Sequence, residues 1–580
     1  MAIGWADIQD WDPADLNTTS ENLSTARSTL MTEAQEASGA KSRVQSTGTA
    51  VDAMLTTLGS LNKDLDTLVN DVSELMMATS EASNGVWEVQ TKVDECHSFA
   101  EQYSYLTIAS DGTVDCTWVA SVEVGDKAKK QADQDMAENS TRSQNYLELD
   151  VKIKDAINRA VEVDEAYRDR LKAVYDGTYQ CDETSASESQ GLPDLPQEGW
   201  SATEVSAWWN SLTEDEKNKI IAEHPEAIGN LDGIAMADRA EANKNRLPGA
   251  IEDAQRELND ARERKNNSSS SLDPDQRTEV NNDVKSAEQK LNDLLALDRL
   301  VNKEGYNLLT LDASGAGEDV RAAVASGDVD NAANVVTMVP GISTTVRESM
   351  DEMLKNGDNL RDKAGSVNTA TVAWLGYDAP RGIPVMDEDP NPNNSHTDYM
   401  TAERAEHAAP ALNSFHEGIH SWHQSQGTDP NLTTVDHSYG SLVAGTALTS
   451  SKSGVVDAAT LYGSPGAYGD SVHDFNVPED HMYVSGNSGD FVVGMGPDAE
   501  FGPSPDQMDG MTPISSGSGG HSDYWNNPEF VEDVGQIAAG EDQSVDRADD
   551  RSEAAAEQER FRENMEEQAE QSSFRDEGLG

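Results

Sequence analysis

Short apolar runs, each closed by Gly, Pro or Asp, alternate with helical stretches from about Tyr306 onwards, and this pattern restricts the fold more than any other feature. The runs are Leu308–Leu311, Val335–Val339, Thr371–Leu375, Leu432–Val435, Val455–Leu461 and Met482–Val484. Alternating strands and helices are typical of a mostly parallel sheet that helices cover on both faces. We therefore expect an α/β domain over residues 302–540.

The first part of the chain predicts long helices, which we assign to a coiled-coil-like region over residues 1–180. A heptad seam, which pairs helices along their length, is formed by Leu61, Leu65, Leu68, Val72 and Leu75. A break is expected near Gly85, and a second helical stretch covers Val151 to about Val174. Such helices pack against each other or bind a partner helix in a groove.

Three further segments complete the predicted organisation. Residues 181–199 are rich in Ser, Glu, Gln, Pro and Gly, which indicates a linker. Capping boxes at Ser201–Glu204 and Thr213–Glu216 begin helices in a helical middle region over residues 200–301. Residues 541–580 have few apolar anchors and are expected to form an acidic tail without a fixed structure.

The charge balance excludes some partners. The chain has 107 acidic and 42 basic side chains and a formal net charge of −65. Phosphate binding needs Lys and Arg, so a nucleic-acid or anionic membrane surface is not expected as a partner. No apolar run approaches the roughly 18 residues of a membrane span, and the first residues do not resemble a signal peptide. The cytoplasm is therefore the default location.

A reactive serine is expected directly after one of the predicted strands. In open parallel sheets, active residues follow the carboxyl ends of strands. The run Leu432–Val435 leads into Asp436-His437-Ser438-Tyr439-Gly440, which resembles the G-x-S-x-G nucleophile elbow. Such an elbow is a sharp turn from strand to helix, which small neighbours permit. Gly440 meets that requirement, whereas Asp436 is larger than the expected Gly.

An activated serine needs a base, and the base needs an acid that orients it. The elbow fold predicts the chain order Ser, acid, His. Asp490 ends the loop after Met482–Val484, and His521 lies in a Gly-rich loop farther on. We therefore predict a triad of Ser438, Asp490 and His521.

The same hypothesis predicts an oxyanion hole. One N–H should come from Tyr439, the residue after the serine, and the other from the loop after an earlier strand. Pro340-Gly341-Ile342 follows such a strand, so Gly341 or Ile342 is the expected second donor.

A rival motif lies upstream of the elbow. His416-Glu417-Gly418-Ile419-His420 matches H-E-x-x-H, which binds zinc from one helix face in metalloproteases. Gly418 weakens a rigid ligand helix, and no later segment clearly supplies a third ligand. We therefore predict no metal site and keep a zinc hydrolase as the less favoured alternative. No G-x-G-x-x-G or phosphate loop follows a strand, so no cofactor is expected.

Four segments together resemble an actinobacterial α/β-hydrolase family of unassigned substrate: Leu375–Pro380, His437–Ser441, Gly463–Gly466 and Gly520–Trp525. The resemblance covers about Trp208 to Gly540. It implies an α/β-hydrolase fold with a Ser-Asp-His triad, which by match to the motifs is Ser438, Asp490 and His521. It implies no substrate, and Asp436 departs from the Gly that the family has at this position.

Family members often carry an N-terminal region similar to the small helical-hairpin proteins of type VII secretion, although the Trp-x-Gly motif itself is missing here. This similarity implies export without a signal peptide as an alternative to the cytoplasm.

The sequence thus predicts a serine hydrolase acting on a small-molecule or lipid-like ester, with thioester or amide cleavage as variants. One alternative is a catalytically inactive scaffold that acts through its helical region. In either case the N-terminal helices could bind a protein partner or a second copy of the chain.

Overall fold

The computed structural model describes residues 3–119, 128–179, 195–196, 199–268, 274–303, 305–314, 319–365, 368–381, 398–496 and 498–541. The described chain divides into two compact units, Met1–Lys219 with Gln424–Thr428, and Ile220–His423 with Asp429–Gly580. Most of the predicted linker at 181–199 and nearly all of the predicted tail at 541–580 lie outside the described residues.

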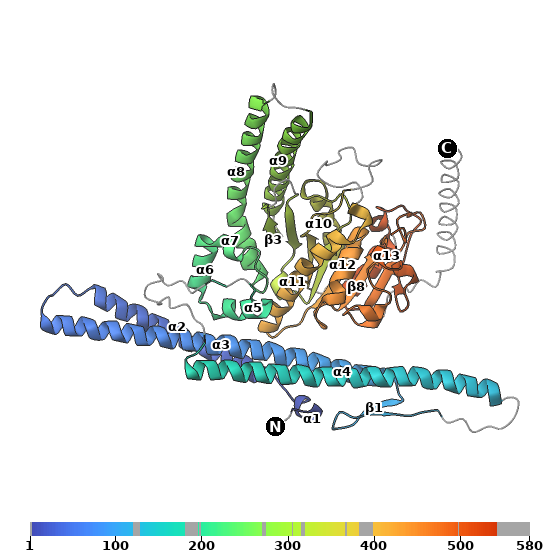
Figure 1. Cartoon of the computed structure of the whole chain (residues 1–580), viewed down its shortest axis with the longest axis horizontal. Coiled ribbons are helices and arrows are strands. Elements are labelled where there is room, and N and C mark those ends of the chain that lie inside the picture. Colours follow the sequence, from blue (N-terminus) through green and yellow to red (C-terminus); the bar gives the residue numbers. More distant parts are fainter. Residues whose placement is uncertain are drawn as a thin grey trace. The chain divides into compact units, whose positions relative to one another are not determined.

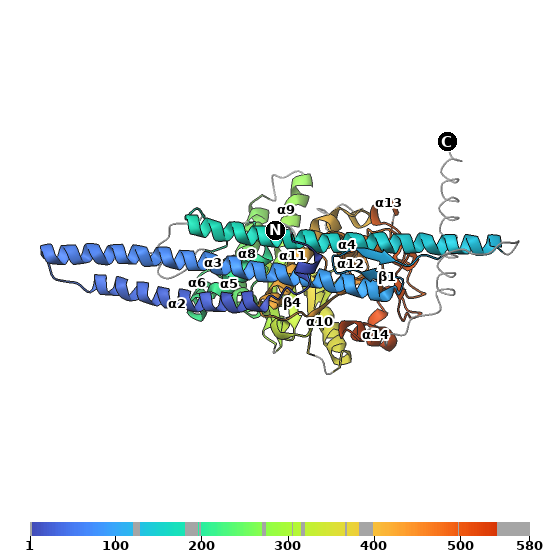
Figure 2. The same ribbon diagram turned by 90° about the horizontal axis from the view of Figure 1, so that it is seen from below.

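The first unit consists mainly of long helices. Its elements are α1 (Trp5–Ile8), α2 (Ala14–Ser42), α3 (Thr49–Gln102), β1 (Leu106–Ile108), β2 (Val114–Cys116), α4 (Ala128–Asp176), α5 (Ala202–Ser211) and the start of α6 (Glu214–Glu223). Helix α3 packs against α2 and α4 along its length (Figures 1 and 2). β1 and β2 form an antiparallel hairpin between α3 and α4.

The predicted heptad seam on α3 is wrong in part. Leu61 and Leu68 are 46% and 47% exposed, whereas Leu65, Val72 and Leu75 are half-buried. A heptad marks an apolar stripe but does not say which neighbour covers it, and α3 contacts several helices.

The predicted break at Gly85 is also wrong, because α3 continues through it. A Cβ at Gly85 would lie 2.5 Å from Cγ2 of Val163 on α4. The glycine therefore serves the close approach of two helices rather than the end of one.

Both predicted capping boxes are confirmed. The Ser201 hydroxyl accepts a hydrogen bond from the Glu204 N–H at 3.3 Å, and the Glu204 carboxylate accepts one from the Ser201 N–H at 2.8 Å. Thr213 and Glu216 form the same pair of bonds at 3.3 and 2.8 Å. These bonds satisfy N–H groups that a helix start leaves without partners.

The second unit is a sheet with helices on both faces. Its described helices include α7 (Pro225–Ile228), α8 (Met236–Ser268), α9 (Pro274–Val301), α10 (Val346–Lys363), α11 (Glu403–Ser425), α12 (Tyr439–Ser450), α13 (Asp498–Phe501) and α14 (Pro528–Ala538). Its strands are β3 (Tyr306–Asp312), β4 (Arg321–Ser326), β5 (Asn334–Val339), β6 (Thr369–Leu375), β7 (Asn431–His437), β8 (Ala458–Tyr462), β9 (Met482–Ser485) and β10 (Thr512–Pro513). Figure 1 shows α8 and α9 side by side as a long hairpin.

The strand order is β10-β9-β8-β7-β5-β6-β4-β3. β4 pairs antiparallel with both β3 and β6, and all other neighbours are parallel. The predicted α/β class with a mostly parallel sheet is therefore confirmed. The sequence analysis missed β4 and the two-residue β10.

Alternate residues of the central strands face two separate cores. Val335 and Val339 of β5 pack with Leu442 and Val443 of α12, whereas Val336 packs with residues of α14. Helices α10 and α14 also contact each other. Since β5 to β10 are parallel, the loops that follow β5, β7, β9 and β10 emerge at the same edge of the sheet.

Within the described residues, no helix combines the length and the apolar composition that a bilayer span requires.

Helix α12 packs closely against the backbone of Ala467, and a substitution of Gly445 tests this packing. A Cβ at Gly445 would lie 2.0 Å from the backbone oxygen of Ala467, whereas a Cβ at Gly249 on α8 would meet nothing within 4 Å. We expect Gly445→Ala to lower the free energy of unfolding by about 1–3 kcal/mol. Gly249→Ala, the matched control, should raise it by roughly 0.4–1 kcal/mol. Urea unfolding followed by circular dichroism measures both, and equal effects would contradict the packing described here.

Candidate active site

The turn between β7 and α12 places Ser438 in an unusual backbone conformation. Ser438 has φ 55° and ψ −127°, in a region that side-chain-bearing residues rarely adopt. Its N–H donates a hydrogen bond to the backbone carbonyl oxygen of Tyr462 at 3.0 Å. A Cβ at Gly440 would lie 2.4 Å from the Val339 oxygen, so only glycine lets α12 begin this close to β5. This strained strand-to-helix turn is the geometry of a nucleophile elbow.

Asp436 does not prevent this turn, although a Gly is expected at its position. Its side chain is fully buried, and the Thr434 hydroxyl donates to Oδ1 at 2.7 Å. Burial raises the pKa of this carboxyl well above its usual value, against the lowering effect of the Thr434 hydrogen bond. The protonated Asp436 carboxyl has no charge, so its burial at this position leaves no charge without a partner.

The structure brings Asp490 and His521 together from loops after β9 and β10. His521 Nδ1 lies 2.9 Å from Oδ2 and 3.0 Å from Oδ1 of Asp490. The Asp490 side chain is 0% exposed and that of His521 is 22% exposed. A buried carboxylate at Nδ1 fixes the ring so that Nε2 is the nitrogen left for proton transfer.

Asp490 has two further donors, neither of which was assigned from the sequence. The Tyr524 hydroxyl donates to Oδ2 at 2.7 Å, and the Val492 N–H donates to Oδ1 at 2.9 Å. Burial alone would raise the pKa of Asp490, but His521 and these donors hold it below its ordinary value. Tyr524 belongs to the segment Gly520–Trp525 that carried the family resemblance, which was the available signal.

His437, beside the serine, was not assigned a role from the sequence either. Its Nε2–H donates to the His521 carbonyl at 2.9 Å, and its ring lies 4.5 Å from the His521 ring and 4.9 Å from that of Tyr462. Burial first, and then the neighbouring His521, lower the pKa of His437 to about 4. The ring is therefore neutral near pH 7 and contacts His521 without adding a positive charge.

The predicted oxyanion residues surround Ser438. A Cβ at Gly341 would lie 2.6 Å from the Ser438 Cβ and 3.0 Å from its Oγ, so the loop after β5 touches the serine. Ile342 and Ser438 line the same pocket. Tyr439 is the first residue of α12, so its N–H lies at the positive end of the helix dipole. Two backbone segments, the loop after β5 and the start of α12, thus lie next to Ser438.

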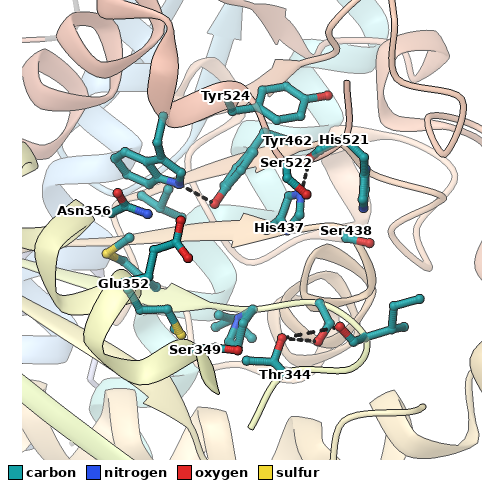
Figure 3. Close-up of a pocket in the computed structure, with 18 of the residues that line it drawn as sticks. Thr344, Ser349, Glu352, Asn356, His437, Ser438, Tyr462, His521, Ser522 and Tyr524 are labelled. Atoms are coloured by element: carbon teal, nitrogen blue, oxygen red, sulfur yellow. Dashed lines mark hydrogen bonds between the residues drawn. The ribbon is translucent and has the colours of Figure 1, made fainter. Parts of the chain in front are cut away.

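These residues open on a pocket of about 290 Å³ that Ser438, His521, His437, Gly341 and Ile342 help to line. Figure 3 shows Ser438 and His521 at one side of this pocket and side chains of α10 at the other. A small ligand could therefore reach both the serine and the imidazole.

The H-E-x-x-H motif is not part of this pocket. His416 is buried in α11, the Glu417 carboxylate pairs with Lys452 at 2.9 Å, and His423 Nε2 lies 2.8 Å from the Val329 oxygen. Among the described residues, no three His, Cys, Asp or Glu side chains gather in a way that could hold a metal ion. The motif therefore lacks the third ligand that a zinc site requires.

Comparison with known proteins gives a family for the second unit. A family model described as alpha/beta hydrolase (Abhydrolase_8) matches residues 315–500, a range that includes Ser438 and Asp490 and ends before His521. The uncharacterized protein Rv0963c of Mycobacterium tuberculosis is 35% identical over 242 residues, which are 40% of this chain and 85% of that protein.

Two more distant similarities extend the comparison. The uncharacterized protein Rv2079 of Mycobacterium tuberculosis is 29% identical over 318 residues, 52% of this chain and 45% of that protein. A solved structure of a thermostable carboxyl esterase from Bacillus coagulans, in complex with glycerol, is 20% identical and covers 29% of this chain and 47% of its own, with a TM-score of 0.17.

The hydrogen bond from Tyr524 to Asp490 predicts a measurable stability difference. Tyr524→Phe removes a buried donor and leaves a carboxylate oxygen with one partner fewer, so the free energy of unfolding should fall by about 1–3 kcal/mol. Tyr468→Phe is the matched control, because its hydroxyl donates at 3.1 Å to the carboxylate of Glu406 at an exposed site. Its effect should stay within roughly 0.5 kcal/mol. Chemical denaturation at pH 7 compares the two, and a larger effect at Tyr468 would contradict the assignment.

Proposed function

This chain belongs to the α/β-hydrolase family, and on that basis we propose that it is a serine hydrolase that cleaves ester bonds through Ser438, Asp490 and His521. The observation that carries the proposal is the pocket that both the elbow serine and the Asp490-paired imidazole line. The chain order Ser, Asp, His is the order of this fold class.

The proposed reaction has two halves. Ser438 Oγ attacks the ester carbonyl carbon while His521 Nε2 takes the hydroxyl proton, and the alcohol then leaves with that proton. Water attacks the acyl-serine next, with His521 again as base, and the carboxylic acid is released. Asp490 keeps its charge throughout and stabilises the imidazolium that forms twice.

The negative charge on the carbonyl oxygen needs donors in both halves. We assign this role to the N–H groups of Tyr439 and of Gly341 or Ile342. Gly341 supports the assignment because its Cα lies against the serine with no side chain between them. Removing one such donor typically costs about 100- to 1,000-fold in kcat.

Esters are the favoured substrates because an alkoxide leaves more easily than an amine, which needs full protonation first. Thioesters satisfy the same requirement and are the nearest variant. An inactive scaffold remains the competing proposal, and a chemical test of Ser438 separates it from the enzyme.

We further propose that the N-terminal helices bind a protein partner or a second copy of the chain. Met54, Leu61 and Leu68 of α3 are spaced seven residues apart and are 43%, 46% and 47% exposed. Such a stripe lies on one side of a helix and suits helix–helix contact. Export by a type VII-like route would be one use of such a contact.

A fluorophosphonate tests the nucleophile directly. The reagent should label the wild-type protein on a single serine. Ser438→Ala should lose at least about 1,000-fold of the labelling rate, because only hydroxyls without an adjacent base are left to react. Ser451→Ala is the control, since Ser451 is a buried serine directly after α12 whose hydroxyl donates to the Leu448 oxygen at 3.2 Å, outside the pocket. Intact-protein mass spectrometry reads the adduct. Labelling that survives in a folded Ser438→Ala protein, or no labelling of the folded wild type, would favour the scaffold.

His416 separates the serine mechanism from the zinc alternative. Burial lowers the pKa of His416 to about 3, so the unfolded chain binds a proton there below about pH 6.5 while the folded chain does not. Stability is therefore lost as the pH falls from about 6.5 towards 3, by at most about 1.4 kcal/mol per pH unit from this group. His416→Leu should reduce the measured slope by this amount, while His420 and His437, whose pKa values burial also lowers to about 4, maintain the rest, and it should keep phosphonate labelling. Denaturation between pH 7 and roughly pH 4 measures the slope, and loss of hydrolysis in the folded variant would restore the zinc hypothesis.

A further inference from the structure

The active-site pocket extends away from the serine to one face of α10. Ser349, Glu352 and Asn356 line it at spacings of three and four residues, which place their side chains on the same side of a helix. Figure 3 shows the Glu352 carboxylate and the Asn356 amide at the side of the pocket opposite Ser438 and His521. A substrate held at the serine can therefore extend to these polar groups.

This far end of the pocket is negatively charged. Among the described residues that line the pocket, Glu352 supplies the one carboxylate, and none is Lys or Arg. The two imidazole rings in the lining are those of His437, which is neutral, and His521, which Asp490 pairs. Glu352 is exposed, and the neighbouring Lys355 interacts with it but forms an ion pair with Asp351 at 2.6 Å. The lining therefore favours a positive group and disfavours an anionic one.

Two aromatic rings form a corner beside Glu352. The rings of Trp525 and Tyr462 lie 6.2 Å apart at 87°, and Trp525 Nε1–H donates to the Tyr462 hydroxyl at 3.0 Å. Tyr524 packs against Tyr462 at 5.1 Å and 65°. All three line the pocket. The faces of aromatic rings attract cations. Several rings together with a carboxylate therefore form a suitable binding site for a substituted ammonium group.

We propose that the Glu352 end of the pocket binds an organic cation, so that the preferred esters carry an ammonium group on the part that extends away from the serine. This inference rests on the proposed ester hydrolysis and names the class of its substrates. The Glu352 carboxylate attracts the positive charge, and the alkylated ammonium group packs against the rings of Trp525 and Tyr462.

Pairs of esters that have the same shape and differ only in charge test the proposal. One ester of each pair carries a trimethylammonium group, and the other carries a tert-butyl group in its place. In the first pair the group is on the alcohol, and in the second it is on the acyl chain, because either part of the ester could face Glu352. The readout is the ratio of kcat/KM between the charged and the neutral ester.

Glu352→Gln keeps the size of the side chain and removes its charge. In at least one pair we expect the wild type to prefer the charged ester and this variant to lose about two- to fivefold of the preference. Asp362→Asn is the control, because it removes one negative charge from an exposed position of the same helix outside the pocket. The preference in wild type should also shrink in high salt.

Equal ratios in wild type and Glu352→Gln for both pairs would overturn the inference. Hydrolysis of the neutral esters tests the proposed function separately, since those substrates do not need Glu352's charge. If no ester is cleaved, tetramethylammonium binding still tests the cation site by saturation-transfer NMR. Binding that weakens about twofold or more in Glu352→Gln, and not in Asp362→Asn, supports the site, and equal binding in all three proteins contradicts it.

Discussion

The left-handed backbone at Ser438 is the constraint on which the site depends. A residue with a side chain adopts this conformation only where its surroundings compensate for the strain. Here the compensation comes from close packing: α12 begins against the Val339 oxygen at Gly440, and the loop after β5 touches the serine at Gly341. The same close approach that permits the turn places the backbone of Gly341 next to the serine. The strained turn and the oxyanion hole that we propose therefore have one structural origin.

Burial organises the charges around this turn. Desolvation alone would neutralise Asp490, yet hydrogen bonds from His521, Tyr524 and Val492 hold its pKa low. Asp436 and His437 have no comparable set of charged partners, and their pKa shifts favour the neutral forms. One carboxylate is thus kept ionised among neutral neighbours. This arrangement directs its charge to a single imidazole, that of His521, which we propose as the base.

Much of this unit was readable from the sequence because its strands are buried on both faces. The apolar runs at β5, β6 and β7 and the order of Ser438, Asp490 and His521 needed no tertiary information. β4 was missed because Arg321-Ala-Ala-Val-Ala-Ser326 is Ala-rich and weakly strand-forming, and β10 because two residues have no periodicity. Tyr524 could not be placed because its role depends on a contact 34 residues away in the chain. On α3 the heptad predicted an apolar stripe, but Leu61 and Leu68 of that stripe are exposed. The tertiary structure decides which residues a neighbouring helix covers, and the heptad does not specify it.

The central claim is that Ser438, His521 and the N–H groups near Gly341 act on one reacting group. A crystal structure of the protein after reaction with a fluorophosphonate tests it most directly. We predict phosphorus bonded to Ser438 Oγ, with its oxygen within about 2.7–3.1 Å of the N–H of Tyr439 and of Gly341 or Ile342. His521 Nε2 should face the bonded Oγ. An adduct on another residue, or a phosphoryl oxygen that points away from both N–H groups, would contradict the account.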